Sequence, residues 1–194
     1  MLKLRGSEKW IDAGYALFAT EGMDGVQIEK VARILKLNKS GFYHYFGTLE
    51  IFFERLVTHH HNMIDALIKD IQDSQNIDPD VLNALIKHHI TMLAQVQLTR
   101  NKINPLFHSA SEISNQKIDQ AVLPVWAEHI GLLTNYDLAL RFCGIVRDMF
   151  YTRIGVEDFN YSFLHSLAEE AKAIVADIFQ EKDRLNKTLI KRQS

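Results

Sequence analysis

The polar residues of one short segment are of the types that bind phosphate groups and the edges of bases. Lys39, Ser40, Tyr43 and His44 lie within six consecutive positions. Lysine pairs with phosphate or guanine, serine and tyrosine hydroxyls donate to phosphate, and histidine reaches the nucleic-acid backbone or a base. Gly41 lies among them and has no side chain to hold a partner at a distance. The segment therefore points to nucleic-acid recognition rather than to catalysis.

Helical spacing indicates which of these side chains face outward and can contact nucleic acid. Phe42 and Phe46 are four residues apart, which predicts one buried helix face. The other side of the same helix then carries Lys39, Ser40, Tyr43 and, in part, His44. The N-terminus of this helix adds partial positive charge and free N–H groups, which favour phosphate oxygens.

Three short helices are expected to position this segment, at 7–21, 27–35 and 38–46. Ser7 and Asn38 are suitable N-cap residues, and Gly22 and Gly47 stand where helices end. A tight turn at 36–38 joins the second helix to the third. This arrangement is typical of a helix-turn-helix domain, in which the second helix of the pair enters the DNA major groove.

The remaining sequence also predicts helices, so we expect an all-α fold with a three-helix domain at 1–47 and a helical bundle at 48–194. Only three prolines occur, and turn signals are too few for a β-sandwich. Thr48 is expected to cap a long helix, and Asp78 is expected to cap a helix that begins at Pro79. The expected helices of this second part are 48–73, 79–98, 105–113, 115–133, 136–154 and 160–186.

Residues 10–53 resemble the DNA-binding domain of the tetracycline-repressor (TetR) family of bacterial transcriptional regulators. The resemblance is carried by Ile11-Asp12-Ala13, Leu17-Phe18-Ala19, Gly22, Ile28, Val31-Ala32 and Leu37-Asn38-Lys39-Ser40-Gly41-Phe42-Tyr43-His44-Tyr45-Phe46. It implies that the N-terminal part binds a double-stranded DNA operator. It also implies that the C-terminal part binds a small-molecule inducer and forms a homodimer through the last two helices. Two-fold symmetry then requires a pseudo-palindromic operator, from which the inducer releases a repressor.

Two departures from the family pattern concern phosphate contacts. Family members usually carry Thr or Ser just before the second helix, where this chain has Val26-Gln27, and a Lys-rich stretch where this chain has Gly47-Thr48-Leu49. We keep Thr48 among the candidate DNA contacts. Each missing phosphate contact flattens the salt dependence of binding by about one unit. The alternative interpretation is therefore a helical ligand-binding or interaction protein whose DNA binding has degenerated.

Charge is distributed unevenly along the chain. The net charge is −2, which argues against a purely electrostatic DNA binder. Residues 1–47 carry seven Lys and Arg against five Asp and Glu, a net +2, whereas residues 48–194 carry a net −4. We therefore expect affinity for DNA to depend on dimerisation and specific contacts more than on bulk electrostatics.

The C-terminal part offers no catalytic constellation, so we expect no enzyme activity. The consecutive histidines His59, His60 and His61 diverge by about 100° each on a helix and do not converge on one ion, so no metal or other cofactor is expected. Cys143 lies on an apolar stripe and is predicted to be a core residue, with a redox sensor as the alternative. Bulky residues that could line an inducer pocket, although most are expected in the core, are Met63, Leu67, Met92, Phe107, His108, Trp126, Phe142 and Met149.

The predicted compartment follows from two absences in the sequence. One cysteine cannot form an internal disulfide, and no apolar run approaches the roughly 18 residues of a membrane helix. We therefore expect a cytoplasmic protein with no membrane partner.

Overall fold

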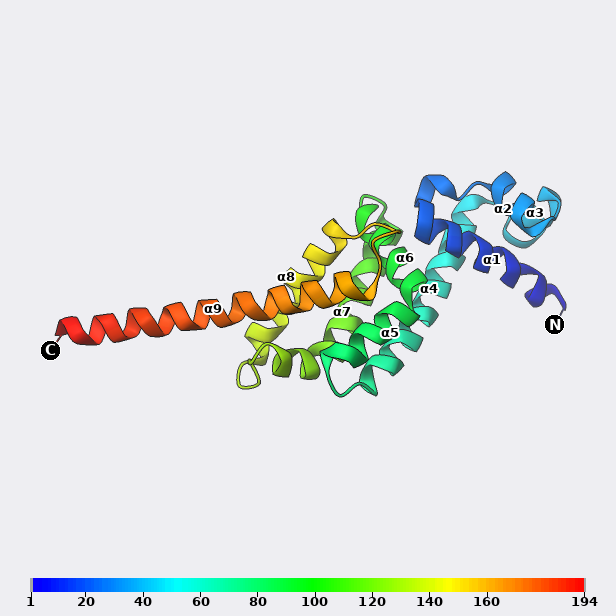
Figure 1. The fold of residues 1–194 in the computed structure, drawn as a ribbon. Helices are drawn as coiled ribbons and strands as arrows, with labels where there is room; N and C mark the ends of the chain where they lie inside the picture. Colours follow the sequence, from blue (N-terminus) through cyan, green and yellow to red (C-terminus); the bar gives the residue numbers. More distant parts are fainter. Residues whose placement is uncertain (1, 194) are drawn as a thin grey trace. The chain divides into compact units, whose positions relative to one another are not determined.

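A computed structural model describes residues 2–193, with side chains described for 6–182 and 184. Every regular element in this range is helical, which confirms the predicted all-α class (Figure 1). The α-helices are α1 (Leu2–Glu21), α2 (Ile28–Leu35), α3 (Lys39–Phe46), α4 (Leu49–Gln72), α5 (Leu82–Lys87), α6 (His89–Arg100), α7 (Pro105–His129), α8 (Tyr136–Arg153) and α9 (Tyr161–Gln193), with a 3₁₀ turn η1 (Met23–Gly25) and a π turn η2 (Ile77–Val81).

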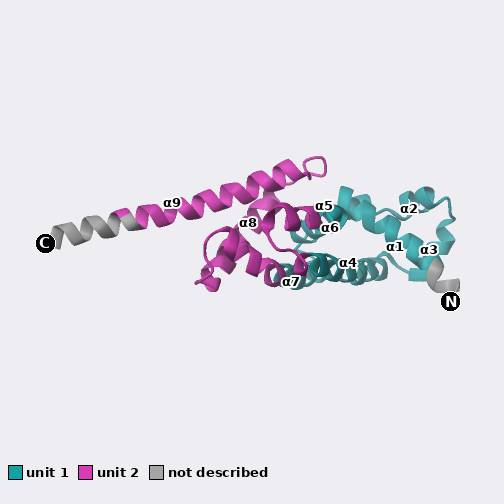
Figure 2. Ribbon diagram, turned by 60° about the horizontal axis from the view of Figure 1, so that its bottom comes forward, with its two compact units in different colours: residues 1–70, 87–118 teal, residues 71–86, 119–194 magenta. Residues whose placement is uncertain are grey.

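The chain divides into two compact units, coloured separately in Figure 2. Unit 1 contains residues 1–70 and 87–118, and unit 2 contains residues 71–86 and 119–194. The functional boundary expected after residue 47 falls inside unit 1. The first three helices are therefore built into a larger core that also contains α6 and the first half of α7.

An aromatic cluster holds the three N-terminal helices on α4. The ring of Phe42 on α3 lies 5.7 Å from Trp10 on α1 and 5.1 Å from Phe52 on α4, centroid to centroid. Phe42 and Phe46 are both buried, as their spacing predicts. Gly14 allows α1 to approach α4, because a Cβ there would lie 2.4 Å from the ring of Phe52.

The turn between α2 and α3 closes as expected from the sequence. Lys36 takes a left-handed conformation (φ 54°) at the end of α2, and Gly47 takes φ 73° at the end of α3.

Thr48 caps α4 as predicted, since its Oγ1 accepts the Ile51 N–H at 3.3 Å. The predicted start of the first helix at Ser7 is wrong, because α1 already begins at Leu2.

Three predictions in the remaining helices are also wrong. The two helices predicted at 105–113 and 115–133 are one, α7, because Ser114 and Asn115 are buried inside it. The helix predicted at 79–98 is divided into α5 and α6 at His88, whose Nε2 contacts Asp70 Oδ2 at 2.6 Å. Asp78 does not act as a cap, since the Asn76 side chain accepts the Asp80 N–H instead and the Asp78 carboxylate contacts Tyr161 and His165.

Unit 2 contains the second half of α7 together with α8 and α9. Two polar contacts join α7 to α8. The indole Nε1 of Trp126 donates to the Ala139 carbonyl at 3.1 Å, and Arg147 on α8 pairs with Asp119 on α7. Cys143 is buried beside Asp119, and burial raises the pKa of its thiol to about 12, as expected of a core cysteine. Among the described residues, no helix is long and apolar enough to cross a membrane.

Candidate nucleic-acid interface

The outer face of α3 carries polar side chains, and the opposite face carries buried aromatic side chains. Lys39, Ser40 and His44 are exposed, and the side chain of Tyr43 is 54% exposed. Phe42 and Phe46 anchor the opposite face, so the helix has little freedom to rotate. Gly41 is half-buried, and Thr48 is exposed at the start of α4.

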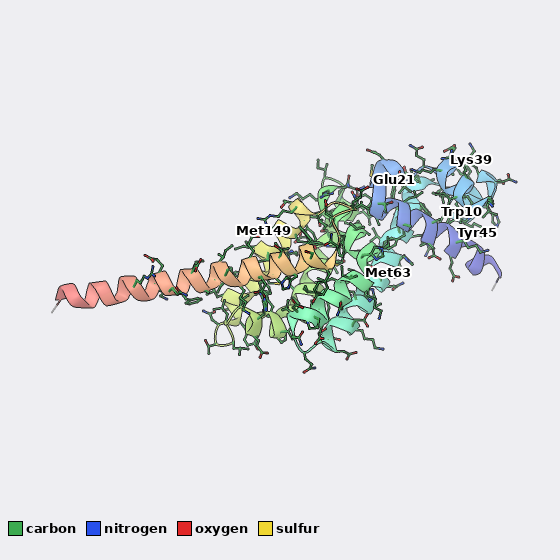
Figure 3. The ribbon with its side chains drawn as sticks, viewed as in Figure 1. Trp10, Glu21, Lys39, Tyr45, Met63 and Met149 are labelled. Atoms are coloured by element: carbon green, nitrogen blue, oxygen red, sulfur yellow. The ribbon has the colours of Figure 1, made fainter. Side chains whose placement is uncertain are left out.

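Lys39 has a partner that the sequence analysis did not identify. Its Nζ lies 2.8 Å from Oε1 of Glu29 on α2 (Figure 3 labels Lys39). The hydrogen bond from Lys39 lowers the pKa of the Glu29 carboxyl, and the same bond raises the pKa of Lys39. The first cation of α3 is therefore partly neutralised by α2, a pairing that a separation of ten residues across a turn does not reveal.

The start of α2 lacks the hydroxyl that the family pattern places there. Val26 is buried, and the side chain of Gln27 makes no capping hydrogen bond. Lys30 on this helix pairs with Glu21. Arg33 is the cation of α2 that is exposed and makes no ion pair with a described residue. The positive charge available from α2 is therefore smaller than its sequence suggests.

The N-terminus of α3 is open to an external acceptor. Asn38 has extended backbone angles, as an N-cap residue does, but its side chain makes no capping hydrogen bond. The first N–H groups of an uncapped helix have no intrahelical acceptor. The Gly41 N–H bonds the Asn38 carbonyl at 3.0 Å. A surface groove lies between α1 and α3 at this end of the helix, lined by Gly6, Lys9, Trp10, Leu37, Asn38, Ser40, Gly41 and Tyr45.

A buried hydrogen-bond chain ties α1 to three other helices of unit 1. Tyr15 Oη lies 2.7 Å from His60 Nδ1, and His60 Nε2 lies 2.8 Å from Gln95 Oε1. Gln95 Nε2 donates onward to Asn115 Oδ1 at 2.7 Å. The oxygen of Gln95 can only accept, so His60 donates through Nε2 and accepts the Tyr15 hydroxyl at Nδ1. We call Tyr15, His60, Gln95 and Asn115 the polar chain.

The polar chain keeps His60 uncharged. Burial lowers the pKa of His60 to about 4, against the smaller opposing effect of its bond to Gln95. Both imidazole nitrogens have protein partners, so this histidine has no free ligand atom for a metal. No group of three or more His, Cys, Asp or Glu suited to a metal ion occurs among the described residues.

The predicted pocket residues are divided between the two units. Leu67, Met92 and Phe107 are buried in unit 1, where Met63 is half-buried and His108 is exposed. Unit 2 contains Trp126, which is buried, with Phe142 and Met149, which are half-buried. Of the unit 1 residues, Phe107 lines a void of about 10 Å³ beside Tyr15 and His60, room for one water molecule. A common inducer pocket for the set stays a prediction.

The fold and the exposed face of α3 define a helix-turn-helix DNA-binding protein. Residues 11–56 match the family model of the bacterial regulatory proteins, tetR family. The predicted resemblance is thereby confirmed for this part of the chain, and residues 11–56 form a DNA-binding domain of the tetR-family type. A comparison with curated proteins gave no match.

Two solved structures extend the similarity of fold beyond this domain. A putative TetR-family transcriptional regulator from Mesorhizobium loti superposes with a TM-score of 0.56 at 16% identity, covering 92% of this chain and 98% of its own. A transcriptional regulator described as TerR/AcrR family, from Aquifex aeolicus, gives a TM-score of 0.59 at 16% identity, covering 87% of this chain and 99% of its own. The helical fold after the DNA-binding domain is therefore also shared with regulators.

Proposed function

We propose that this chain is a homodimeric, ligand-responsive repressor that leaves a pseudo-palindromic operator when a small molecule binds within residues 48–194. The observation that carries the proposal is the exposed face of α3, where Lys39, Ser40, Tyr43 and His44 stand above the buried Phe42 and Phe46. These residues have the donors needed for phosphate groups and for the edges of nucleobases. The buried rings of Phe42 and Phe46 hold the helix in place.

Exposed apolar side chains on the last two helices support the homodimer. Ile145 on α8 is 56% exposed, and Ile178 on α9 is 51% exposed. Large apolar residues clustered on a surface mark interaction sites. The exposed apolar residues of the two helices are Tyr136, Leu140, Ile145, Tyr161, Ile174, Ile178 and Phe179. In a symmetric dimer the two copies of α3 would read half-sites about 34–36 Å apart.

The test is selection of operator sequences from a random duplex library with the full-length protein. We expect enrichment of a pseudo-palindrome, bound more weakly as salt increases. Lys39→Ala and Tyr43→Ala should each lower operator affinity, with the dimer unchanged by analytical ultracentrifugation. Absence of any selected sequence at low salt from a dimeric protein would overturn the proposal. Unaltered affinity in both variants would reject the contact residues assigned to α3.

The alternative function is a helical ligand-binding or interaction protein without operator binding. Two observations favour it, because Val26 is buried and Leu49 is half-buried where family members carry phosphate-contacting side chains. A screen of thermal stability against small molecules separates the alternatives when combined with the selection. A ligand at 100 times its dissociation constant adds about 2.7 kcal/mol to stability. A stabilising ligand together with no selected operator supports the alternative, and a stabilising ligand that releases the selected operator supports the repressor.

A further inference from the structure

A carboxylate of α2 lies beside the exposed face of α3. Glu29 holds Lys39, the first residue of α3, with Nζ at 2.8 Å from Oε1. The sequence of α3 contains no Asp or Glu, so α2 supplies this negative charge. A carboxylate repels the phosphates of a duplex and lowers affinity for DNA in general. Its position at this face therefore calls for an explanation.

Stability does not explain the pair of Glu29 and Lys39. Both side chains are more than half exposed, and ion pairs this exposed contribute little to stability. The pair of Glu21 and Lys30 is less exposed and joins α1 to α2, and Figure 3 shows Glu21 well apart from Lys39. Of these two pairs, it is the more exposed one that lies at the start of α3, where helix-turn-helix proteins contact base edges.

The two charged groups of this pair keep unused hydrogen-bonding capacity. A lysine ammonium has three donors and a carboxylate has about four acceptor sites, and the contact between Lys39 and Glu29 uses one of each. A further partner can therefore bind without breaking the pair. It must present an acceptor to the ammonium and a donor to the carboxylate, side by side.

The major-groove edge of a G·C base pair has this pattern. Guanine presents the acceptors N7 and O6, and cytosine presents the N4 amino donor. O6 and N4 are joined by a hydrogen bond of about 2.9 Å, close to the 2.8 Å between Lys39 Nζ and Glu29 Oε1. Lysine with guanine and glutamate with cytosine are also pairings that these side chains favour in DNA recognition.

We propose that Lys39 and Glu29 together contact one G·C base pair in each half-site, with Nζ donating to guanine and the carboxylate accepting from cytosine N4. The inference rests on the proposed operator binding and names a base pair that the operator must contain. An inverted C·G pair would place the N4 donor against the ammonium, so the order of the two bases is fixed. In an A·T pair the acceptor next to the amino donor is thymine O4, which lies beside a methyl group rather than a second acceptor.

The same pair lowers binding to other sequences. With another base pair at this position, the ammonium and the carboxylate are not both satisfied, and Glu29 still keeps Lys39 from the phosphates. Specificity is a difference between affinities, so a group that weakens the wrong complex increases it. Glu29 is thereby a specificity-determining residue rather than a general DNA contact.

The test compares base preferences of the full-length protein and its variants. Operators are selected from a random duplex library, and affinities are then measured with each of the four base pairs placed at every half-site position in turn. We expect one position at which the wild type prefers G·C over A·T about tenfold. At this position Glu29→Gln should prefer G·C only about twofold, because a glutamine amide also pairs with adenine.

Glu21→Gln is the matched control, because it removes the same charge from the ion pair between α1 and α2. Its base preferences should equal those of the wild type. If Glu29→Gln raises affinity equally for every base pair, Glu29 only competes for Lys39, and the inference is overturned. An equal loss of preference in Glu21→Gln also overturns it, because net charge alone would then cause the loss.

A charge exchange tests the order of the two bases. In Glu29→Lys/Lys39→Glu the donor and the acceptor trade helices, so the preferred base pair at the same position should change from G·C to C·G. A retained preference for G·C, a loss of all preference, or a wild-type operator with no such position overturns the base-pair contact and leaves the proposed function standing. Absence of any sequence selected by the wild type overturns both.

Discussion

Lys39 Nζ lies 2.8 Å from Glu29 Oε1, so a carboxylate of α2 holds the first cation of α3. The two side chains are 53% and 66% exposed. DNA must therefore compete with Glu29 for this lysine.

Glu29→Gln should strengthen DNA binding. Removing the carboxylate frees Lys39 for a phosphate and removes a negative charge that repels the duplex. We expect affinity to rise by only about two- to fivefold at low salt, because exposed ion pairs are weak. The salt dependence should become steeper, because the freed Lys39 neutralises a phosphate. Fluorescence anisotropy with a labelled mixed-sequence duplex measures both. Measured against Lys39→Met alone, the double variant Glu29→Gln/Lys39→Met should gain less affinity than Glu29→Gln gains over the wild type, and an equal gain would show that Glu29 acts independently of Lys39.

Stability should fall in mild acid because of His60. Its pKa is about 4 in the folded protein and about 6.5 in an unfolded chain. Between these values the unfolded chain binds more protons, so the free energy of unfolding rises with pH. The contribution is fully present above about pH 6.5 and is lost as the pH falls to about 4, a difference of about 3 kcal/mol. Urea unfolding at intervals across this range measures it.

His60→Gln is the control for the pH dependence. Glutamine keeps a hydrogen-bonding side chain between Tyr15 and Gln95 but does not titrate. The variant should be less stable than the wild type near pH 8 and depend less on pH between about 4 and 6.5. An unchanged slope would mean that other groups, such as His59 and His61, whose pKa values are also lowered by burial, cause the loss.

Gly14→Ala should destabilise unit 1. A Cβ there would lie 2.4 Å from Cζ of Phe52, and Phe52 is fully buried with Phe46 at a centroid distance of 4.8 Å. The ring has no room to move, so we expect a loss of about 1–3 kcal/mol from overpacking. Chemical denaturation followed by circular dichroism measures the loss. The matched control is Gly41→Ala, where the same methyl has space, and equal losses in the two variants would contradict this explanation.

Ile178→Asp should break the proposed dimer. Burying an isoleucine in each protomer contributes about 1.5–3 kcal/mol, so the two copies together change the dimer dissociation constant by about 100-fold or more. Sedimentation velocity over a concentration series measures the shift to monomer. The matched control is Ile103→Asp, because Ile103 is 97% exposed and lies outside α8 and α9. If Ile178→Asp remains dimeric like the control, α9 does not form the interface through this residue.

The sequence predicts features that depend on neighbours along the chain. The spacing of Phe42 and Phe46 predicts the buried face of α3, and Thr48 and Gly47 predict how α4 begins and α3 ends. Each of these depends on local helical geometry, which a period of 3.6 residues encodes. The polar residues of α3 are exposed for the same reason.

Features that join distant parts of the chain were not predictable in this way. The neighbourhood of Trp10 and Gly41, and the bond of His60 to Gln95, depend on how helices pack rather than on spacing. The sequence predicts that one helix ends at 113 and the next begins at Asn115, yet Asn115 lies inside α7 and accepts a hydrogen bond from Gln95 in the core. Asp78 matched the pattern of a cap, but Tyr161 and His165 provide partners for its carboxylate.

The packing of Phe107 limits how this protein can be re-engineered. Phe18 and Phe53 lie in the matched domain, and their rings lie 5.4 and 5.5 Å from Phe107 on α7. A fragment cut after residue 56 would expose both rings to water and lose His60, the hydrogen-bond partner of Tyr15. A chimera that transfers this DNA specificity to another sensor therefore needs α6 and the first half of α7 as well. The transplantable cassette is discontinuous in sequence, and its grafting points lie within helices rather than in loops, because the unit boundaries fall in the last turns of α4 and α5 and in the middle of α7.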